Sequence, residues 1–174
     1  AARYQAELAN GFGNLASRVL AMVTRYCDNT VPAATELNEA DAVIADTVSK
    51  AFDAANSAID RLAIHDAITA VWTIVDALNL YITEQEPWVL AKDDANRERL
   101  HTVLYTAVEG LRAIAVGLSP IMPTSTQKLW DALGLDDALG NLTDQNLSRA
   151  GQWGITPAGI RVSALDSLFP RIEE

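Results

Sequence analysis

The chain has 174 residues, 49% of them hydrophobic, which suits one domain with a sizeable core. Its 23 acidic side chains outnumber its 13 lysines and arginines, and the formal net charge of -10 argues against binding to membrane surfaces, to DNA, or non-specifically to any nucleic acid. The one cysteine cannot form an internal disulfide, and neither a signal peptide nor an apolar run long enough for a bilayer is visible. We therefore expect a cytoplasmic protein that would hold a polyanion only at a local site.

Apolar residues recur along the chain at the spacing of amphipathic helices, which predicts an all-α fold. The first predicted helix runs from Arg3 to Tyr26, and its apolar stripe is Leu8, Phe12, Leu15, Val19, Met22 and Tyr26. Its stretch NGFGNLASR contains two glycines, and each interior glycine costs a helix about 1 kcal/mol relative to alanine. Close packing of another part of the chain and close approach of a ligand both explain why they are kept.

Three more long helices and a short one are predicted. They run from about Asn38 to Leu62, Asp66 to Glu84, Asn96 to Leu118, and Thr124 to Gly134. Asn38 with Asp41 predicts an N-cap, Thr124 with Gln127 resembles a capping box, and Gly134 provides a C-terminal stop. The residues expected to anchor these helices in the core are Ile44, Val48, Phe52, Ala55, Ile59, Leu62, Ile68, Val71, Trp72, Val75, Leu78, Ile82, Leu100, Val103, Leu104, Ala107, Leu111, Ile114, Leu118 and Trp130.

The segment 135–174 is punctuated by glycine and proline and has no sustained period, so we expect an irregular tail that wraps a surface. The architecture that fits is a bundle of about four long helices plus a short fifth helix and this tail, forming a single domain over residues 1–174. Because the chain starts with AARYQAEL, without a methionine and inside a helical pattern, we expect it to be part of a longer protein.

Sequence signatures of catalysis are missing. The chain contains no glycine-rich phosphate loop and no nucleophile elbow, and His65 and His101 lack cysteine or acidic neighbours at zinc-binding spacing. No pair among the many acids stands out from the solvated faces of amphipathic helices. We assign no catalytic residue, metal or cofactor to this chain.

One side of the first predicted helix carries a polar strip. Steps of about 100° per residue bring together Arg3, Asn10, Asn14, Arg18 and Arg25. Asparagine and arginine one turn apart can present an amide donor, a carbonyl acceptor and a planar guanidinium to one object, which suits the edge of a nucleobase. Pairing of the same side chains with acids on a neighbouring helix is the alternative.

The second informative stretch is YITEQEPWVLAK, from Tyr81 to Lys92. Pro87 ends the third helix, so Trp88 lies just outside it. Such a tryptophan is either a core plug at a helix end, which the pattern alone favours, or a platform on which an unstacked base stacks. Trp72 and Trp130 are expected in the core.

Four segments, NGFGNLASR, YITEQEPWVLAK, LSPIMPTSTQKLWDALG and LFPRIE, occur in an order and at intervals that resemble the C-terminal helical anticodon-binding domain of bacterial-type methionyl-tRNA synthetases. The resemblance covers essentially the whole chain. It implies that Asn14 and Arg18 hydrogen-bond anticodon bases and that the first anticodon base, cytosine, stacks on Trp88. It also implies places in or beside that site for Asn10, Pro87 and Lys92.

The same resemblance implies a role for the rest of the protein. Members of this family activate methionine with ATP and magnesium in an upstream Rossmann-type domain, whose HIGH-like and KMSKS-like signatures are absent here. The implied parent is a methionine–tRNA ligase, in which this chain selects methionine tRNA by its CAU anticodon, is inactive alone, and packs its tail toward the upstream catalytic domain. One departure is Thr83, where some members carry an acid whose part in shaping the site does not carry over.

Two alternatives stay open. One is the equivalent domain of another class I synthetase, such as the cysteine or leucine enzyme, which the combination of NLASR with PW-x-x-AK argues against. The other is a helical protein-interaction module with no RNA role, in which Trp88 is a core residue.

Overall fold

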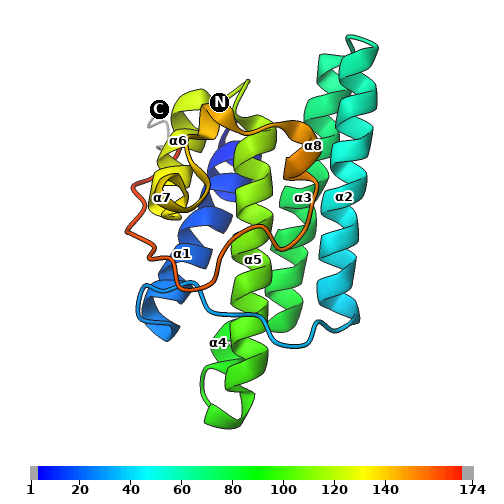
Figure 1. Cartoon of the computed structure of the whole chain (residues 1–174). Coiled ribbons are helices and arrows are strands. Elements are labelled where there is room, and N and C mark those ends of the chain that lie inside the picture. The colour runs from blue at the N-terminus through cyan, green and yellow to red at the C-terminus, as the bar shows by residue number, and fades with distance from the viewer. Residues whose placement is uncertain (1–3, 170–174) are drawn as a thin grey trace.

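The computed structural model describes residues 4–169, in which helices account for the regular structure apart from an isolated antiparallel bridge between Thr30 and Arg161. The helices in chain order are η1 (Tyr4–Gly13), α1 (Asn14–Tyr26), α2 (Glu39–Asp60), α3 (Ile64–Gln85), α4 (Pro87–Leu90), η2 (Asp94–Asn96), α5 (Arg97–Leu118), α6 (Pro123–Ala132), α7 (Leu135–Leu139), η3 (Leu142–Asp144) and α8 (Leu147–Ala150). The long helices α1, α2, α3 and α5 form a bundle, with α4 at its lower end in Figure 1. The predicted all-α bundle is confirmed.

Helix α5 is the centre of this bundle. It packs against α1, α2, α3, α4, α6 and α8, and every residue from Thr102 to Val116 is buried. Its close packing on α3 depends on a small residue, because a Cβ on Gly110 would lie 2.6 Å from Cδ1 of Leu78. The predicted apolar stripe of this helix is therefore confirmed. The helix is more buried than the stripe predicts, because its middle turns are covered on all faces.

Helix α2 begins as predicted and ends earlier. The Asn38 side chain accepts a hydrogen bond from the Asp41 backbone N–H at 3.1 Å, and the Asp41 carboxylate accepts one from the Asn38 N–H at 2.9 Å, which completes a capping box. At the other end, Ile59 and Leu62 are 38% and 85% exposed, so their predicted place in the core is wrong. The helix ends at Asp60, and Leu62 turns into the left-handed region with a φ of 59°.

Helix α3 confirms the third predicted helix, with two exceptions in its stripe, Ile68 and Trp72, and Ile68 is half-buried. Trp72 is half-buried and not in the core; its ring meets Phe12 edge-on, at 6.3 Å between centroids and an interplanar angle of 80°.

Helix α6 starts one residue before the predicted position, at Pro123. The predicted capping box of Thr124 is wrong, because Met122 is the N-cap and proline at the first helical position fixes the start. Trp130 anchors the helix as expected: it is fully buried and its indole N–H donates to the Gly140 carbonyl at 3.1 Å. Gly134, with a φ of 71°, confirms the predicted C-terminal stop.

The tail contains three short helices, α7, η3 and α8, which its lack of period did not predict. A buried ion pair on α5 holds the tail against the bundle. In this pair the Arg112 guanidinium donates to Glu109 at 2.8 Å. Arg112 also donates to the carbonyls of Ala150 and Gln152, and Glu109 accepts from the backbone N–H groups of Ile155 and Thr156. The expectation that the tail wraps a surface is confirmed, and that surface is the chain's own bundle. Residues 170–174 of the LFPRIE region lie outside the described part.

Candidate nucleic-acid interface

The first predicted helix is two helices of different type. Residues 4–13 form the π-helix η1, in which each turn is wider than an α-turn, and α1 starts at Asn14. The prediction of one continuous α-helix is wrong because the 100° step does not hold across η1. The Asn79 side chain on α3 donates to the Gly11 carbonyl at 3.4 Å, which ties η1 to the bundle.

Gly13 ends η1 where the tail comes close. A Cβ at this position would lie 3.1 Å from Cδ2 of Phe169 and 3.2 Å from the carbonyl oxygen of Leu8. Of the two explanations for the glycines, close packing therefore accounts for Gly13.

Asn10 and Asn14 meet at one cavity despite the change of helix type. This cavity of about 240 Å³ is lined by Asn10, Asn14 and Ser17 on one side and by Ser167 and Phe169 of the tail on the other. Both asparagines are exposed. Arg3, the first residue of the predicted strip, lies outside the described residues.

Arg18 and Trp88 are brought together from α1 and α4. The guanidinium carbon of Arg18 lies over the Trp88 ring, 5.8 Å from its centroid, in a cation–π contact. Trp88 keeps 36% of its surface exposed, so it is not a core plug. Pro87 beside it is buried, and Lys92 is exposed two residues beyond the end of α4.

A sharp turn sets Trp88 apart from α3. Glu86 links α3 and α4 with φ 45° and ψ 56°, a left-handed conformation that costs a residue other than glycine about 1–2 kcal/mol. Pro87 disfavours the right-handed helical conformation for the residue before it, so α3 cannot simply continue. The prediction that Trp88 lies outside the third helix is confirmed; its own one-turn helix α4 was not predicted.

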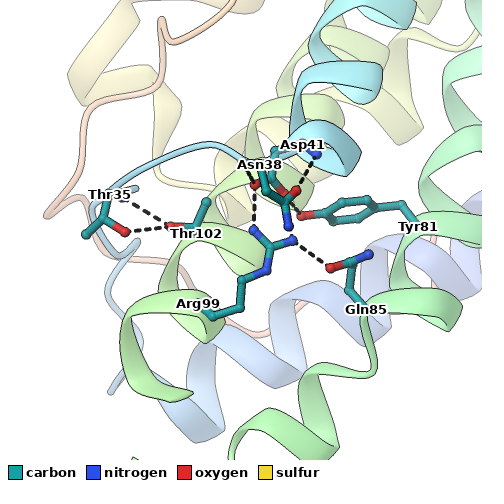
Figure 2. A network of polar contacts seen from close by, with 7 residues as sticks. All are labelled: Thr35, Asn38, Asp41, Tyr81, Gln85, Arg99 and Thr102. Atoms are coloured by element: carbon teal, nitrogen blue, oxygen red, sulfur yellow. Dashed lines mark hydrogen bonds and ion pairs between the residues drawn. The ribbon is translucent and has the colours of Figure 1, made fainter. Parts of the chain in front are cut away.

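A buried carboxylate secures the end of α3, one turn before Trp88 (Figure 2). The fully buried Asp41 at the start of α2 accepts hydrogen bonds from the Tyr81 hydroxyl and from Arg99, whose two guanidinium nitrogens lie 2.5 and 2.9 Å from its oxygens. Arg99 also donates to the Gln85 side chain at 2.6 Å. The starts of α2 and α5 are thereby fastened to the last two turns of α3.

The charges in this network are set by its hydrogen bonds. Burial alone would raise the pKa of Asp41, but the bonds from Arg99, Tyr81 and the Asn38 N–H outweigh it and hold this pKa below its ordinary value. Burial, and then the neighbouring Asp41 carboxylate, raise the pKa of the Tyr81 hydroxyl well above its usual range. Asp41 is therefore an anion and Tyr81 a neutral donor at neutral pH.

Of this network, only Asn38 and Asp41 were predicted from the sequence, as a helix cap. A further signal in the sequence is Arg99, a cation in the first turn of α5, where the helix dipole disfavours positive charge unless an acid is near. Thr83, the noted departure, is exposed on α3 and its hydroxyl donates to the Asn79 carbonyl at 2.9 Å.

Residues 31–174 match the model of a family described as the anticodon binding domain of methionyl tRNA ligase. The chain belongs to this family. The chain is 51% identical to a methionine–tRNA ligase of Streptomyces coelicolor over 99% of its own length and 33% of that protein, and 40% identical to one of Deinococcus radiodurans over 98% and 24%.

Solved structures give the same answer for the fold of this anticodon-binding domain. The apo crystal structure of Mycobacterium tuberculosis methionyl-tRNA synthetase superposes with a TM-score of 0.88 at 32% identity, covering 99% of this chain and 34% of that one. A structure of the same enzyme in complex with methionyl-adenylate gives a TM-score of 0.87. The chain thus spans a third or less of the two curated relatives named above, and the alternative of another class I synthetase is set aside.

The family model covers only some of the candidate site residues. Pro87, Trp88 and Lys92 lie within residues 31–174, whereas Asn10, Asn14 and Arg18 precede them and are covered by the alignments to whole relatives. Within the described 4–169, no helix is long and apolar enough to cross a membrane, and no three histidine, cysteine or acidic side chains cluster in a way that could hold a metal ion.

Proposed function

We propose that this anticodon-binding domain recognises the CAU anticodon of methionine tRNA. The observation that carries the proposal is the Arg18 guanidinium over the partly exposed ring of Trp88, at 5.8 Å from its centroid. This pair combines a partly exposed aromatic ring with a planar set of donors in contact with it, which is what recognition of an unpaired base needs. Because the formal charge of -10 gives no general attraction for RNA, binding must come from such a local site.

In this proposal the anticodon loop is splayed open and its cytosine stacks on Trp88. Arg18 and Asn14, one helical turn apart on α1, hydrogen-bond to polar edges of the anticodon bases. Asn10 contributes from the cavity that it shares with Asn14. Pro87 fixes the turn that presents Trp88, and Lys92 supplies a positive charge beyond α4.

We extend the proposal to the protein of which this chain would be one part, a methionine–tRNA ligase. Relatives named methionine–tRNA ligase support it. The sequence has no glycine-rich phosphate loop, and among residues 4–169 no three histidine, cysteine or acidic side chains cluster to hold a metal ion, so the proposal assigns no ATP, magnesium or methionine to this chain. They would bind an upstream catalytic domain, and this single domain of residues 1–174 would be inactive alone.

The proposed partners are methionine tRNA and that upstream catalytic domain, toward which part of the tail would face, in the cytoplasm. Neither DNA nor a membrane is a proposed partner.

The experiment measures binding of two anticodon stem-loops, one with CAU and one with UAU, to the full-length protein at fixed salt. Wild type should prefer CAU. Trp88→Ala should lose about 5- to 150-fold in affinity for the CAU loop, the value of one base–aromatic stack. Val89→Ala is the matched control, because it removes a 42% exposed apolar side chain from the same turn and should bind normally.

Equal binding of both loops by wild type, or a preference that survives in Trp88→Ala, would overturn the proposal. The alternative function, a helical protein-interaction module with no RNA role, would then be favoured.

A further inference from the structure

A second guanidinium–aromatic pair lies on α1, two helical turns beyond the first. The guanidinium carbon of Arg25 is 5.7 Å from the centroid of the Tyr26 ring, and Arg25 follows Arg18 by seven residues. Seven residues correspond to about 10 Å along a helix axis. Helix α1 therefore carries two arginines on one side, two turns apart, each placed over an aromatic ring.

A cavity of about 240 Å³ opens beside the second pair, between the end of α1 and the connection from α4 to α5. Its lining includes Arg25, Tyr26, Leu90, Asp93, Asp94 and Arg97. Helix α4 contributes to both places, through Trp88 at the first pair and Leu90 at this cavity. Both places therefore lie where α1 and α4 meet.

The polar groups that line this cavity include both hydrogen-bond donors and acceptors. Arg25 and Arg97 supply planar donors, and Asp93 and Asp94 supply acceptors. Asp94 accepts from Arg97 at 2.6 Å and Asp93 from the Ala95 N–H at 2.9 Å, and each carboxylate keeps further lone pairs. Two carboxylates repel a bare phosphate, whereas the edge of a base carries donors and acceptors together and its faces suit an aromatic ring and a guanidinium.

We propose that this cavity is a second base subsite, which takes one further unpaired nucleobase of the RNA loop that occupies Trp88. The proposal rests on the proposed function. Arg18 and Arg25 stand about 10 Å apart along α1, three times the 3.4 Å separation of stacked bases, so two bases bound beside them would be unstacked from each other, as in a splayed loop.

The test uses the full-length protein and a set of CAU stem-loops, each lacking one base of the loop while keeping its phosphates. The variants are Tyr26→Ala, Arg25→Gln and, as reference for the first platform, Trp88→Ala. Arg61→Gln is the matched control, because it removes another exposed arginine, at the C-cap of α2. Affinities are compared loop by loop.

We expect removal of one loop base, other than the cytosine on Trp88, to weaken wild-type binding about 5- to 150-fold. Tyr26→Ala should abolish this penalty and Arg25→Gln should reduce it, while both keep the penalty for the missing cytosine. Trp88→Ala should do the reverse, and Arg61→Gln should leave every penalty unchanged.

Two results would overturn the subsite. Uniform weakening of all loops by Arg25→Gln and Tyr26→Ala would show a backbone contact, and unchanged relative affinities would show no contact. If Trp88→Ala also lacks any position-specific effect, the proposed function has failed and the subsite falls with it. Should Tyr26→Ala unfold, Arg25→Gln decides the outcome, since its side chain is exposed.

Discussion

Replacing Arg99 with methionine should expose how much the buried network contributes to stability. The change leaves the Asp41 carboxylate, which is fully buried, with only the Tyr81 hydroxyl and the Asn38 N–H as donors. Removing one partner of a buried ion pair costs about 3–5 kcal/mol, and because the Arg99 side chain is 24% exposed we expect about 3 kcal/mol.

The cost should depend on pH in a defined direction. In wild type the pKa of Asp41 is held below its ordinary value, so the carboxylate stabilises the fold above that value and the contribution is lost as pH falls through the lowered pKa. Without the guanidinium, burial is opposed less and this pKa rises. The variant is then most destabilised at pH 7, and its deficit shrinks toward pH 4 as its Asp41 becomes neutral.

Equilibrium urea unfolding of the 174-residue chain at pH 7 and pH 4, followed by circular dichroism, measures both quantities. Arg97→Met is the matched control: its ion pair with Asp94 is exposed, so it should change the free energy of unfolding little at either pH. The reasoning is refuted if Arg99→Met matches wild type, or if its deficit is the same at both pH values.

Three further outcomes are expected. Arg18→Lys keeps the charge but loses the planar fork, so preference for CAU over UAU loops should fall toward one in a binding titration; full retention would exclude a reading role for the guanidinium. Affinity for the CAU loop should fall only modestly between low and high salt, because few phosphates are neutralised by a chain of charge -10, and a steep slope would contradict local readout. Gly134→Ala should lower the free energy of unfolding by about 2 kcal/mol or more, since its φ is 71° and the new Cβ would lie 2.2 Å from the Arg161 carbonyl oxygen; an unchanged urea midpoint would contradict this.

The helices could be predicted because their signals are local. Apolar spacing and the Asn38–Asp41 cap act within one or two turns, and the structure confirms this cap and the long helices other than the first half of the first one. The π-helix η1 could not be predicted in this way, because its register depends partly on Asn79, which donates to Gly11 from 68 residues away. The same holds for Ile59 and Leu62, whose exposure depends on where α2 turns into α3.

The candidate site could be predicted only in part, because its contacts join segments that are far apart in the chain. Arg18 and Trp88 were singled out separately, by a polar strip and by a tryptophan after a helix end, and the resemblance placed them in one site. Their contact requires α1 and α4 to meet, which no local pattern states. The hydrogen bonds of Asp41 to Tyr81 and Arg99 could not be predicted, because these residues lie 40 and 58 residues from Asp41 in the chain.

The central claim is that a cytosine of the anticodon stacks on Trp88, and a double-mutant cycle between protein and RNA tests it most directly. The full-length protein, as wild type and as Trp88→Ala, is titrated with a CAU stem-loop and with the same loop lacking only its cytosine base. The account predicts that removing either the ring or the base costs about 1–3 kcal/mol and that removing both costs no more than one of them. If the two costs simply add, the base and the ring do not touch, and the account is contradicted.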